Sequence, residues 1–378
     1  MSDFGQILIS PRVAIHQELE QTRQQFHSLV ASLDELDLYL PSGNPALSIG
    51  ETLYQIILVL GLVRMEVTCL RLGLRYPQTC APAFRRLITT LTRLGVRNKN
   101  RAELVRDYDR EYEYTVNTLR NVSESDWQIG RQYFDFDPPI LDGVATIEDL
   151  FRYPGKHLLA YEKDIREGLA RLEQMSSPRQ VEEAPLALPD QSGWMSYPTH
   201  PLHKALFKAP IILWRLGLGT VLGQFLMLIS HTGRKSGRTR RTMVEYHTIA
   251  GSKYIPCAFG PHSDWYQNMT ADPNVTIQTR QGVESVRGER VTDERELLAV
   301  YYHLMRRNPL MTKSYLASLD IQPEASDLLA KKDRVYWLRF DPVEAPTPPP
   351  QRADLVFIWL FALAGGILGW LLARRKRR

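Results

Sequence analysis

The feature that most constrains the fold is a change of sequence pattern on either side of residues 176–199. That segment is rich in Ser, Pro and acidic residues and carries no apolar periodicity, which is typical of an interdomain linker. Residues 11–175 place apolar side chains mostly at helical spacing, whereas residues 200–341 contain short runs typical of strands. Because 378 residues are enough for two cores, we predict an α+β multidomain protein.

The N-terminal part, residues 1–175, is predicted to be a four-helix bundle with some extra turns. Proline and glycine breakers separate its apolar runs, and Ser48 with Glu51 three residues later has the spacing of a capping box. We expect residues 126–143, which contain two adjacent prolines, to form a long loop. The predicted helices span about residues 12–33, 48–72, 84–94, 101–122 and 146–175.

The second part, residues 200–341, is predicted to consist mainly of strands. Six short apolar runs with few helices between them suit a small β-barrel. The predicted strands are Phe225–His231, Thr242–Ile249, Lys253–Phe259, Val275–Thr279, Val283–Val291 and Val335–Phe340. Helices are expected near Asp264–Thr270 and Asp293–Arg306.

A basic turn between the first two of these strands is the main candidate binding site. Five of the eight residues from Arg234 to Arg241 are Arg or Lys. Gly233 and Gly237 permit positive φ angles and let backbone N–H groups approach a ligand closely. Arg offers a planar fork for phosphate or carboxylate, and Lys offers a point charge. From these residues alone, a solvated hairpin or a nonspecific polyanion patch is an equal alternative.

Beyond a Pro-rich linker at residues 342–352, the segment 353–373 is predicted to be a transmembrane helix. Leu355 to Ala373 include no charged residue, and about 19 residues at about 1.5 Å each cover the roughly 30 Å hydrocarbon core of a bilayer. A buried core helix is the alternative, but this segment lacks a polar face and a basic tail, residues 374–378, follows it. We expect the linker to be a stiff spacer and the span to pack on nothing in the barrel.

A short basic amphipathic helix is expected at residues 202–216, with Lys204, Lys208 and Arg215 away from its apolar face and a kink at Pro210. Two interpretations of this helix stay open. It either packs across the barrel or contacts anionic membrane lipid.

The expected location is a membrane, with a single C-terminal anchor and both folded domains in the cytoplasm. The three cysteines are an odd number without metal-ligand spacing, and the N-terminus has no signal-peptide pattern. The positive-inside rule would place residues 374–378 in the cytoplasm, so either this tail crosses the bilayer or the segment bends at Gly365–Gly366. Nucleic acid is not an expected partner despite the net charge of +5, and a homo-oligomer is left open.

Three blocks in a fixed order resemble the deazaflavin-dependent nitroreductase family, also called the F420-dependent quinone reductase family. They are Pro210–Gly223, the Gly233–Gly237 turn, and Phe259–Asn268 followed by Asp272-Pro-Asn274. The similarity covers about residues 200–340. It implies a split β-barrel, an architecture shared with oxidases that bind flavin mononucleotide.

The resemblance also implies a set of cofactor-binding positions for the deazaflavin coenzyme F420. Arg234, Lys235 and Arg240 match positions that meet its anionic part, and Ser236 and Gly237 can add hydrogen bonds. The ring side is expected at Ala258, Phe259 and Gly260, and helix residues Trp265 and Asn268 complete the set. Many members carry a longer Gly-rich segment with a Lys where this chain has Pro261-His-Ser263, so the ring-side contacts are expected to differ from those of such members.

Tyrosines on a later helix line the acceptor pocket in that family. Tyr301, Tyr302 and Tyr315 lie in the matching region, and we assign Tyr302 and Tyr315 as candidate catalytic residues of the acceptor pocket. No spacing indicates a nucleophile paired with a base.

The N-terminal part resembles the DinB-like family of helical bundles, which commonly hold a divalent metal with three histidines. The matching stretches are Leu47–Gln55 and Thr146–Tyr161. Gln55 and Tyr161 stand where that family has histidines, and only His157 is retained. Because Gln and Tyr are poor ligands for a zinc-like ion, we expect no bound metal and predict that His157 is a hydrogen-bonded interior residue.

Together these observations predict a membrane-tethered oxidoreductase that transfers a hydride from reduced F420 to a small quinone-like or nitro-aromatic acceptor. One alternative is a non-catalytic module that binds lipid or another cofactor and uses the bundle for docking. Another is an oxidoreductase that uses flavin mononucleotide (FMN). FMN has one phosphate and no polyanionic tail, so the five basic residues of the turn exceed what it needs.

Overall fold

The computed structural model describes residues 11–74, 81–97, 99–137, 141–175, 209–257, 260–359 and 370. The chain divides into two compact units, Met1–Arg179 and Gln180–Arg378. The first is helical and the second contains an antiparallel sheet, so the predicted α+β organisation with an N-terminal helical region is confirmed.

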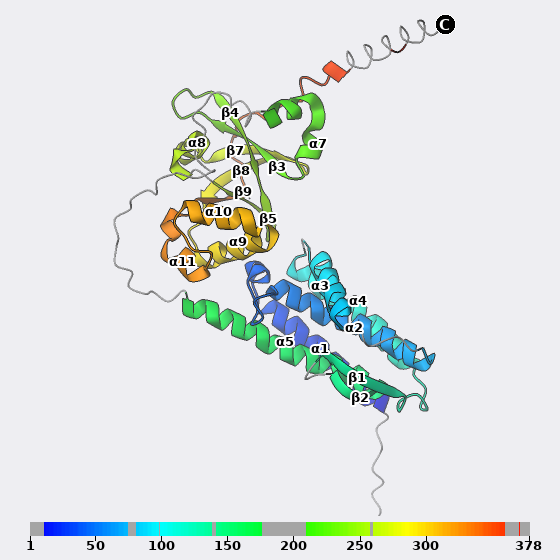
Figure 1. Ribbon diagram of the computed structural model, residues 1–378. Coiled ribbons are helices and arrows are strands. Elements are labelled where there is room, and N and C mark those ends of the chain that lie inside the picture. The colour runs from blue at the N-terminus through cyan, green and yellow to red at the C-terminus, as the bar shows by residue number, and fades with distance from the viewer. Residues whose placement is uncertain are drawn as a thin grey trace, which may run out of the picture. The chain divides into compact units, whose positions relative to one another are not determined.

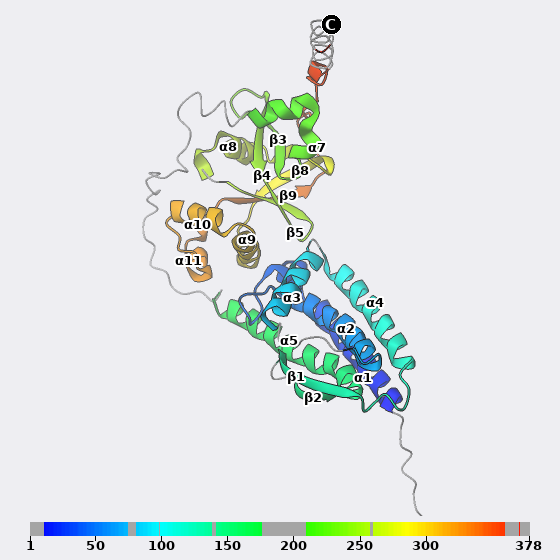
Figure 2. The same ribbon diagram turned by 45° about the vertical axis from the view of Figure 1, so that its right-hand side comes forward.

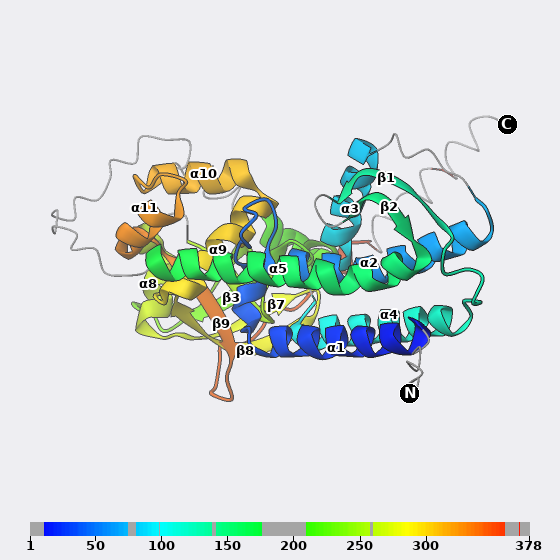
Figure 3. The ribbon, with the colours of Figure 1, turned by 90° about the horizontal axis from the view of Figure 1, so that it is seen from below.

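The N-terminal unit is built on four long helices that pack side by side (Figures 1 and 3). These are α1 (Pro11–Ala31), α2 (Ile49–Arg71), α4 (Arg101–Arg120) and α5 (Ile147–Met175). Both α1 and α2 contact both α4 and α5. The short helix α3 (Ala81–Gly95) and the 3-10 turn η1 (Glu35–Tyr39) contact α2.

Local sequence signals set two of the helix starts. The Ser48 hydroxyl accepts a hydrogen bond from the Glu51 N–H, and the Glu51 carboxylate accepts one from the Ser48 N–H at 2.8 Å. Asn100 and Glu103 make the same reciprocal pair at the start of α4. These side chains satisfy N–H groups that have no partner within the helix, so the predicted capping box at Ser48 is present.

By length and composition alone, helix α2 is long and apolar enough to cross a membrane. No other helix in the described part of the chain meets both conditions. About half of its most apolar window is buried inside the bundle, with Leu53, Leu60 and Val67 fully covered. A core helix of a helical bundle passes the same length and composition test.

The prediction of a long loop at residues 126–143 is wrong, because the chain forms a β-hairpin there. Strand β1 (Gly130–Asp137) pairs antiparallel with β2 (Leu141–Thr146). Tyr133 of β1 is buried and its hydroxyl donates to Glu66 of α2 at 2.6 Å, while Arg131 pairs with the same carboxylate at 3.3 Å. These contacts are far apart in the sequence, so local propensity gave no sign of them.

The C-terminal unit contains one antiparallel sheet (Figure 2). Its strand order is β4-β3-β7-β8-β9-β6-β5. Strands β4 and β5 occupy opposite edges of this order, yet Tyr246 alone separates them in the chain. One strand therefore bends at Tyr246 and joins the two edges, which curls the sheet. The strands are β3 (Leu226–Thr232), β4 (Thr239–Glu245), β5 (His247–Ile249), β6 (Ser252–Pro256), β7 (Asn274–Thr279), β8 (Gly282–Arg290) and β9 (Trp337–Pro342).

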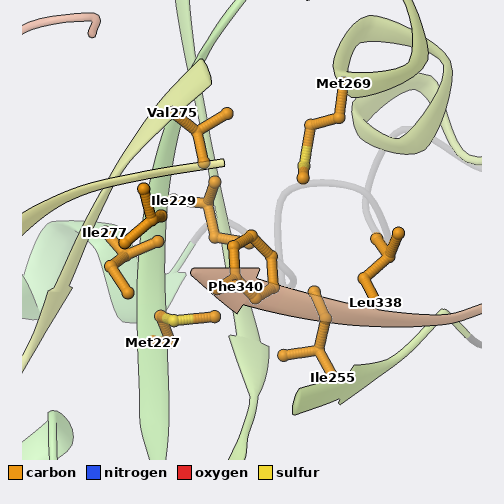
Figure 4. Close-up of a cluster of buried hydrophobic side chains, with 9 residues drawn as sticks. Met227, Ile229, Ile255, Met269, Val275, Ile277, Leu338 and Phe340 are labelled. Atoms are coloured by element: carbon orange, nitrogen blue, oxygen red, sulfur yellow. The ribbon is translucent and has the colours of Figure 1, made fainter. Parts of the chain in front are cut away.

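Alternate residues of these strands form the core of the sheet (Figure 4). Met227 and Ile229 of β3 and Val275 and Ile277 of β7 point inward, as the two-residue period of a strand requires. Phe340 of β9 lies among them, and each such fully buried side chain contributes about 1.5–3 kcal/mol to folding. The remaining members are Ile255, Met269, Val286 and Leu338.

Helices connect and cover the sheet. Helix α8 (Asp264–Ala271) packs on β3, and α9 (Glu294–Arg307), α10 (Pro309–Ser318) and α11 (Ala325–Ala330) gather beside the sheet (Figures 1 and 2). The sequence predicted α8 and α9 but not α10 or α11. Asn308 caps α10 and Pro309 is its first residue, which is a helix-start signal.

The Pro-rich segment after β9 lies on the sheet instead of forming a free spacer. Thr276 of β7 donates a hydrogen bond to the Pro348 carbonyl and lies 2.7 Å from the Thr347 hydroxyl. The Gln278 side chain exchanges two hydrogen bonds with the Gln351 backbone, at 2.6 and 3.1 Å. We call residues 343–351 the strap, because they cross strands β7 and β8 and hold the chain against them.

Most of the predicted transmembrane segment, residues 360–369 and 371–373, and the basic tail lie outside the described residues, as do the linker and the start of the amphipathic helix. The described part of that helix begins at Ala209 and continues through η3 (Trp214–Leu218) and α7 (Gly219–Leu222). Its kink lies at Gly217, where φ is +89°. A side chain at this φ would be strained, which favours Gly.

Candidate functional site

The basic turn connects β3 and β4 and has a defined backbone. The Gly233 N–H donates to the Arg238 carbonyl at 2.9 Å, and the Gly237 N–H donates back to the Gly233 carbonyl at 2.8 Å. Gly237 has a φ of +63°, in the left-handed region that favours Gly. A Cβ at Gly233 would lie 2.9 Å from the Ser236 hydroxyl and 3.2 Å from the Arg238 carbonyl, so a side chain there would require these neighbours to shift.

The turn presents its cations to solvent. Lys235, Ser236, Arg238 and Arg240 are exposed. Within the described ranges, none of the three cationic side chains among them makes an ion pair. Such unpaired cations on one short turn can bind an extended anion without first breaking an internal ion pair.

Arg234 differs from these residues because helix α8 holds it. Its backbone N–H and its Nη1 both donate to Asn268 Oδ1 at 3.0 Å. Its guanidinium also lies 3.2 Å from the Asp264 carboxylate at the start of the helix. The structure thus brings together Arg234 and Asn268, which the sequence predicted separately as cofactor-binding residues.

His231 extends this chain of contacts into the sheet. Asn268 is only 6% exposed, and its Oδ1 already accepts from Arg234, so its Nδ2 is the donor toward His231 Nδ1 at 3.2 Å. His231 Nδ1 must therefore carry no proton, and the neutral ring has its proton on Nε2. Burial lowers the pKa of His231 to about 4, which agrees with a neutral ring.

Sequence reasoning gave no role to His231 or Asp264. His231 is the next-to-last residue of an apolar strand and could have been selected for that reason, because a histidine in a buried strand needs a polar partner. Nothing in the sequence identified that partner, since Asn268 is 37 residues away.

The predicted ring-side residues are only partly described. Ala258 and Phe259 lie outside the described residues. Gly260 has a φ of +45°, and a Cβ there would lie 2.8 Å from the Tyr336 ring, so the position accepts only Gly without a shift. Trp265 is half-buried and packs against the sheet core.

The two candidate acceptor-pocket tyrosines differ in their surroundings. Tyr315 is buried, stacks on Trp337 with a ring separation of 6.3 Å, and its hydroxyl accepts from the Tyr336 N–H at 3.4 Å. Burial raises its pKa strongly. Tyr302 is half-buried beside Tyr301, and burial raises its pKa too. Both hydroxyls therefore stay protonated near neutral pH and could act only as neutral donors or acceptors.

In the helical unit, His157 is an interior residue of α5. It is 3% exposed and stacks on Tyr161 at 4.1 Å, with Tyr153 edge-on at 5.5 Å. Burial lowers its pKa to about 3, so the ring is neutral. Gln55 is half-buried on α2. Within the described ranges no group of three or more His, Cys, Asp or Glu side chains could hold a metal ion.

Comparisons with known proteins address the sheet unit. Residues 216–321 match the family described as F420H(2)-dependent quinone reductase. A solved structure described as F420-H2 dependent reductase (FDR-A) is 18% identical, with a TM-score of 0.24, and the match covers 31% of this chain and 93% of that one. Another, described as a domain-swapped dimer, is 17% identical with a TM-score of 0.26, covering 38% of this chain and 100% of that one. No curated protein matches.

The matched range begins in the helix before β3, contains the basic turn and helix α8, and ends after α10. It therefore includes Arg234, His231 and Asn268, the residues that form the hydrogen-bonded chain described above. Residues 216–321 of this chain are an F420H2-dependent quinone reductase domain.

Proposed function

We propose that this protein is a membrane-tethered oxidoreductase that moves a hydride from reduced F420 to a quinone-like or nitro-aromatic acceptor. The observation that carries the proposal is the β3–β4 turn, which exposes Lys235, Arg238 and Arg240 while α8 holds Arg234. Reduced F420, when bound, supplies the hydride.

The residues of the turn fit a polyanionic cofactor. F420 carries a phosphodiester and a polyglutamate tail, so it needs several cations along one surface. Lys235, Arg238 and Arg240 would bind these charges, and Ser236 would add a hydrogen bond. A flavin mononucleotide has one phosphate and would leave most of these cations without a ligand.

Arg234 and Asn268 have a different role in this proposal. Asn268 and Asp264 restrict the Arg234 guanidinium, so less side-chain freedom is lost when an anion binds. His231 in turn orients the Asn268 amide. We assign Arg234 to binding, and Asn268 and His231 to positioning.

A titration tests the binding proposal. Charge-assisted hydrogen bonds contribute about 1.5–3 kcal/mol each, so Lys235→Ala and Arg240→Ala should each weaken F420 binding about tenfold or more. Arg287→Ala is the control, because Arg287 is an exposed cation that pairs with Glu289 on β8. Fluorescence of F420 during titration reports the affinities. Equal affinities for all three variants and the unmodified chain would rule out the turn as the binding site.

Turnover separates the function from its alternatives. We expect the protein to oxidise reduced F420 with a short-chain quinone or a nitro-aromatic acceptor, followed by the change in deazaflavin absorbance. Binding and turnover with FMN alone would indicate the flavin alternative. Binding of F420 without turnover by any acceptor would indicate a non-catalytic module.

The fold assignments and the anchor complete the proposal. The curled antiparallel sheet supports a split β-barrel, and the packing of α1, α2, α4 and α5 supports a DinB-like bundle. Residues 353–373 would form a single C-terminal anchor, and a lipid-soluble quinone is then a convenient acceptor. Because F420 is reduced by cytoplasmic enzymes, we place both folded domains in the cytoplasm.

A further inference from the structure

An exposed apolar surface lies where the helix at residues 209–222 meets the start of β3. Val221 is 60% exposed and Phe225 is 64% exposed, and Ile212 and Leu213 of the same helix are also exposed. Single exposed apolar residues are common on soluble proteins, but a cluster marks an interaction surface.

The chain returns to this helix after the strap. The Arg215 guanidinium forms two hydrogen bonds with the Asp354 carboxylate, at 2.7 and 2.8 Å. The Leu355 N–H donates to the Arg215 carbonyl, and the Trp359 indole N–H donates to the Leu216 carbonyl at 2.8 Å. Figures 1 and 2 show this last described segment, in red, beside the helix that ends in α7.

The backbone of Gly217 lies close to the returning segment. A Cβ at Gly217 would lie 3.0 Å from Val356, and the kink at this residue frees the Leu216 carbonyl to accept from Trp359. Val356, Ile358 and Trp359 are themselves exposed. The expectation that the span at residues 353–373 packs on nothing in the barrel domain is therefore wrong for its described start, residues 353–359.

We call this composite surface the junction face. It combines exposed apolar residues from two segments that are far apart in the sequence. Its members are Ile212, Leu213, Val221, Phe225, Val356, Ile358 and Trp359.

We propose that the junction face rests on the lipid surface of a membrane. The first reason is continuity, since Val356 and Trp359 lie at the start of the uncharged sequence that runs from Leu355 to Ala373. The same apolar environment that suits the following residues must therefore begin next to this face.

Charge and residue type give a second reason. Arg280 follows β7, is exposed, and donates its backbone N–H to the Gly223 carbonyl, so an arginine lies next to the turn that leads to Phe225. Arg352 is exposed just before Asp354. Cations beside aromatic and aliphatic side chains are typical of segments that lie at the interface of an anionic bilayer.

This inference rests on the anchor proposed above and goes beyond it. An anchor alone would leave the sheet domain free to turn on its linker. The strap and the contacts of Arg215 and Trp359 instead join the start of the anchor to the sheet domain, so a membrane would meet this domain at one face.

Lipid cross-linking of the full chain tests the inference. The protein would be reconstituted in phosphatidylcholine–phosphatidylglycerol vesicles containing a lipid with a photoactivatable diazirine on its acyl chain. Mass spectrometry then maps the adducts. We expect adducts on peptides covering residues 209–225 as well as on residues 353–373. Peptides around Val283 and Leu310, exposed apolar residues elsewhere in this unit, should carry none.

Variants strengthen the test. Val221→Asp combined with Phe225→Asp should reduce adducts at residues 209–225 by about tenfold, because a carboxylate resists burial in lipid. Leu310→Asp is the matched control and should leave them unchanged. Val221, Phe225 and Leu310 are all exposed, so the fold of each variant should persist. Oxidation of reduced F420 by a water-soluble acceptor should be unaffected.

The outcomes separate the two proposals. Adducts confined to residues 353–373 would overturn the junction face and leave the anchor standing. Absence of adducts from both regions would overturn the anchor as well. Oxidation of reduced F420 by the same vesicles reports the catalytic function independently of either result.

Discussion

At the scale of single residues, the candidate site depends on one amide. Asn268 accepts twice from Arg234 and donates to His231, so it connects the basic turn, helix α8 and strand β3. A buried side chain with three hydrogen bonds is costly to replace, because its partners would be left without their own. The position therefore couples the stability of the domain to the shape of its basic turn.

Replacing Asn268 should affect both stability and binding. Asn268→Ala should lower the free energy of unfolding by about 1–3 kcal/mol and weaken F420 binding. Asn268→Asp keeps the oxygen that accepts from Arg234, so it should retain more F420 affinity than the Ala variant. Urea unfolding and fluorescence titration measure the two effects. Equal binding losses in both variants would show that the contact to Arg234 is not what matters.

A second residue-scale prediction concerns pH. His157 has a pKa lowered to about 3 by burial, below its ordinary value of 6.5. Between these two pH values, His157 of the unfolded chain therefore binds a proton, while His157 of the folded bundle does not. The contribution of neutral His157 to the free energy of unfolding is fully present above pH 6.5. It is lost as the pH falls, at up to about 1.4 kcal/mol per pH unit.

The variant His157→Phe removes this titration and keeps an aromatic ring between Tyr153 and Tyr161. Its bundle should lose less stability between pH 6.5 and pH 5 than the unmodified one. Urea unfolding followed by circular dichroism at several pH values measures the difference. If the free energy of unfolding changed equally with pH in both proteins, His157 would have the same pKa in the folded and unfolded states.

At the scale of elements, the strap changes the meaning of the Pro-rich sequence. Prolines cannot donate backbone hydrogen bonds, so a run of them is often solvated and extended. Here the polar residues around the prolines make the contacts, since Thr347 and Gln351 bond with Thr276, Ser285 and Gln278 of the sheet. The strap covers Thr276 and Gln278 and shields them from solvent.

Gln278 should hold the end of the strap. Gln278→Ala removes two hydrogen bonds with the Gln351 backbone from a buried position, so the sheet domain should lose about 1–3 kcal/mol of stability. Hydrogen exchange at the Gln351 amide should become faster. The control is Gln281→Ala, because the Gln281 side chain is exposed and its backbone makes the local contact. Unchanged exchange at Gln351 would contradict the assignment of the strap.

At the scale of the whole molecule, the membrane arrangement is the main question. The apolar segment and its basic tail are at the C-terminal end, and the reductase domain precedes them. The positive-inside rule alone would place the tail in the cytoplasm and both domains outside. The supply of reduced F420 by cytoplasmic enzymes instead favours a placement of both domains in the cytoplasm.

We expect both folded domains to be on the cytoplasmic side. Protease added to intact spheroplasts should then leave the reductase domain undigested, and disruption of the membrane should expose it. A tag after Arg378 distinguishes a tail that crosses the bilayer from a segment that bends at Gly365–Gly366 and returns. Digestion of the reductase domain from outside intact spheroplasts would refute this placement.

The sequence by itself determined the class of fold, most elements of the sheet and the location of the basic turn. Period-two apolar runs and capping residues act over a few neighbours, so strands such as β3 and β7 and the start of α2 could be predicted. The match of residues 216–321 confirms that ordered motifs identified the reductase domain.

Only the tertiary structure decided which residues meet. The β1–β2 hairpin depends on Glu66, the strap depends on Gln278, and the ties of His231 and Arg234 depend on Asn268. Each of these contacts joins segments that are far apart in the chain. A polar side chain carries no local signal of its distant partner, because its hydrogen bonds form only after the apolar core has brought the elements together.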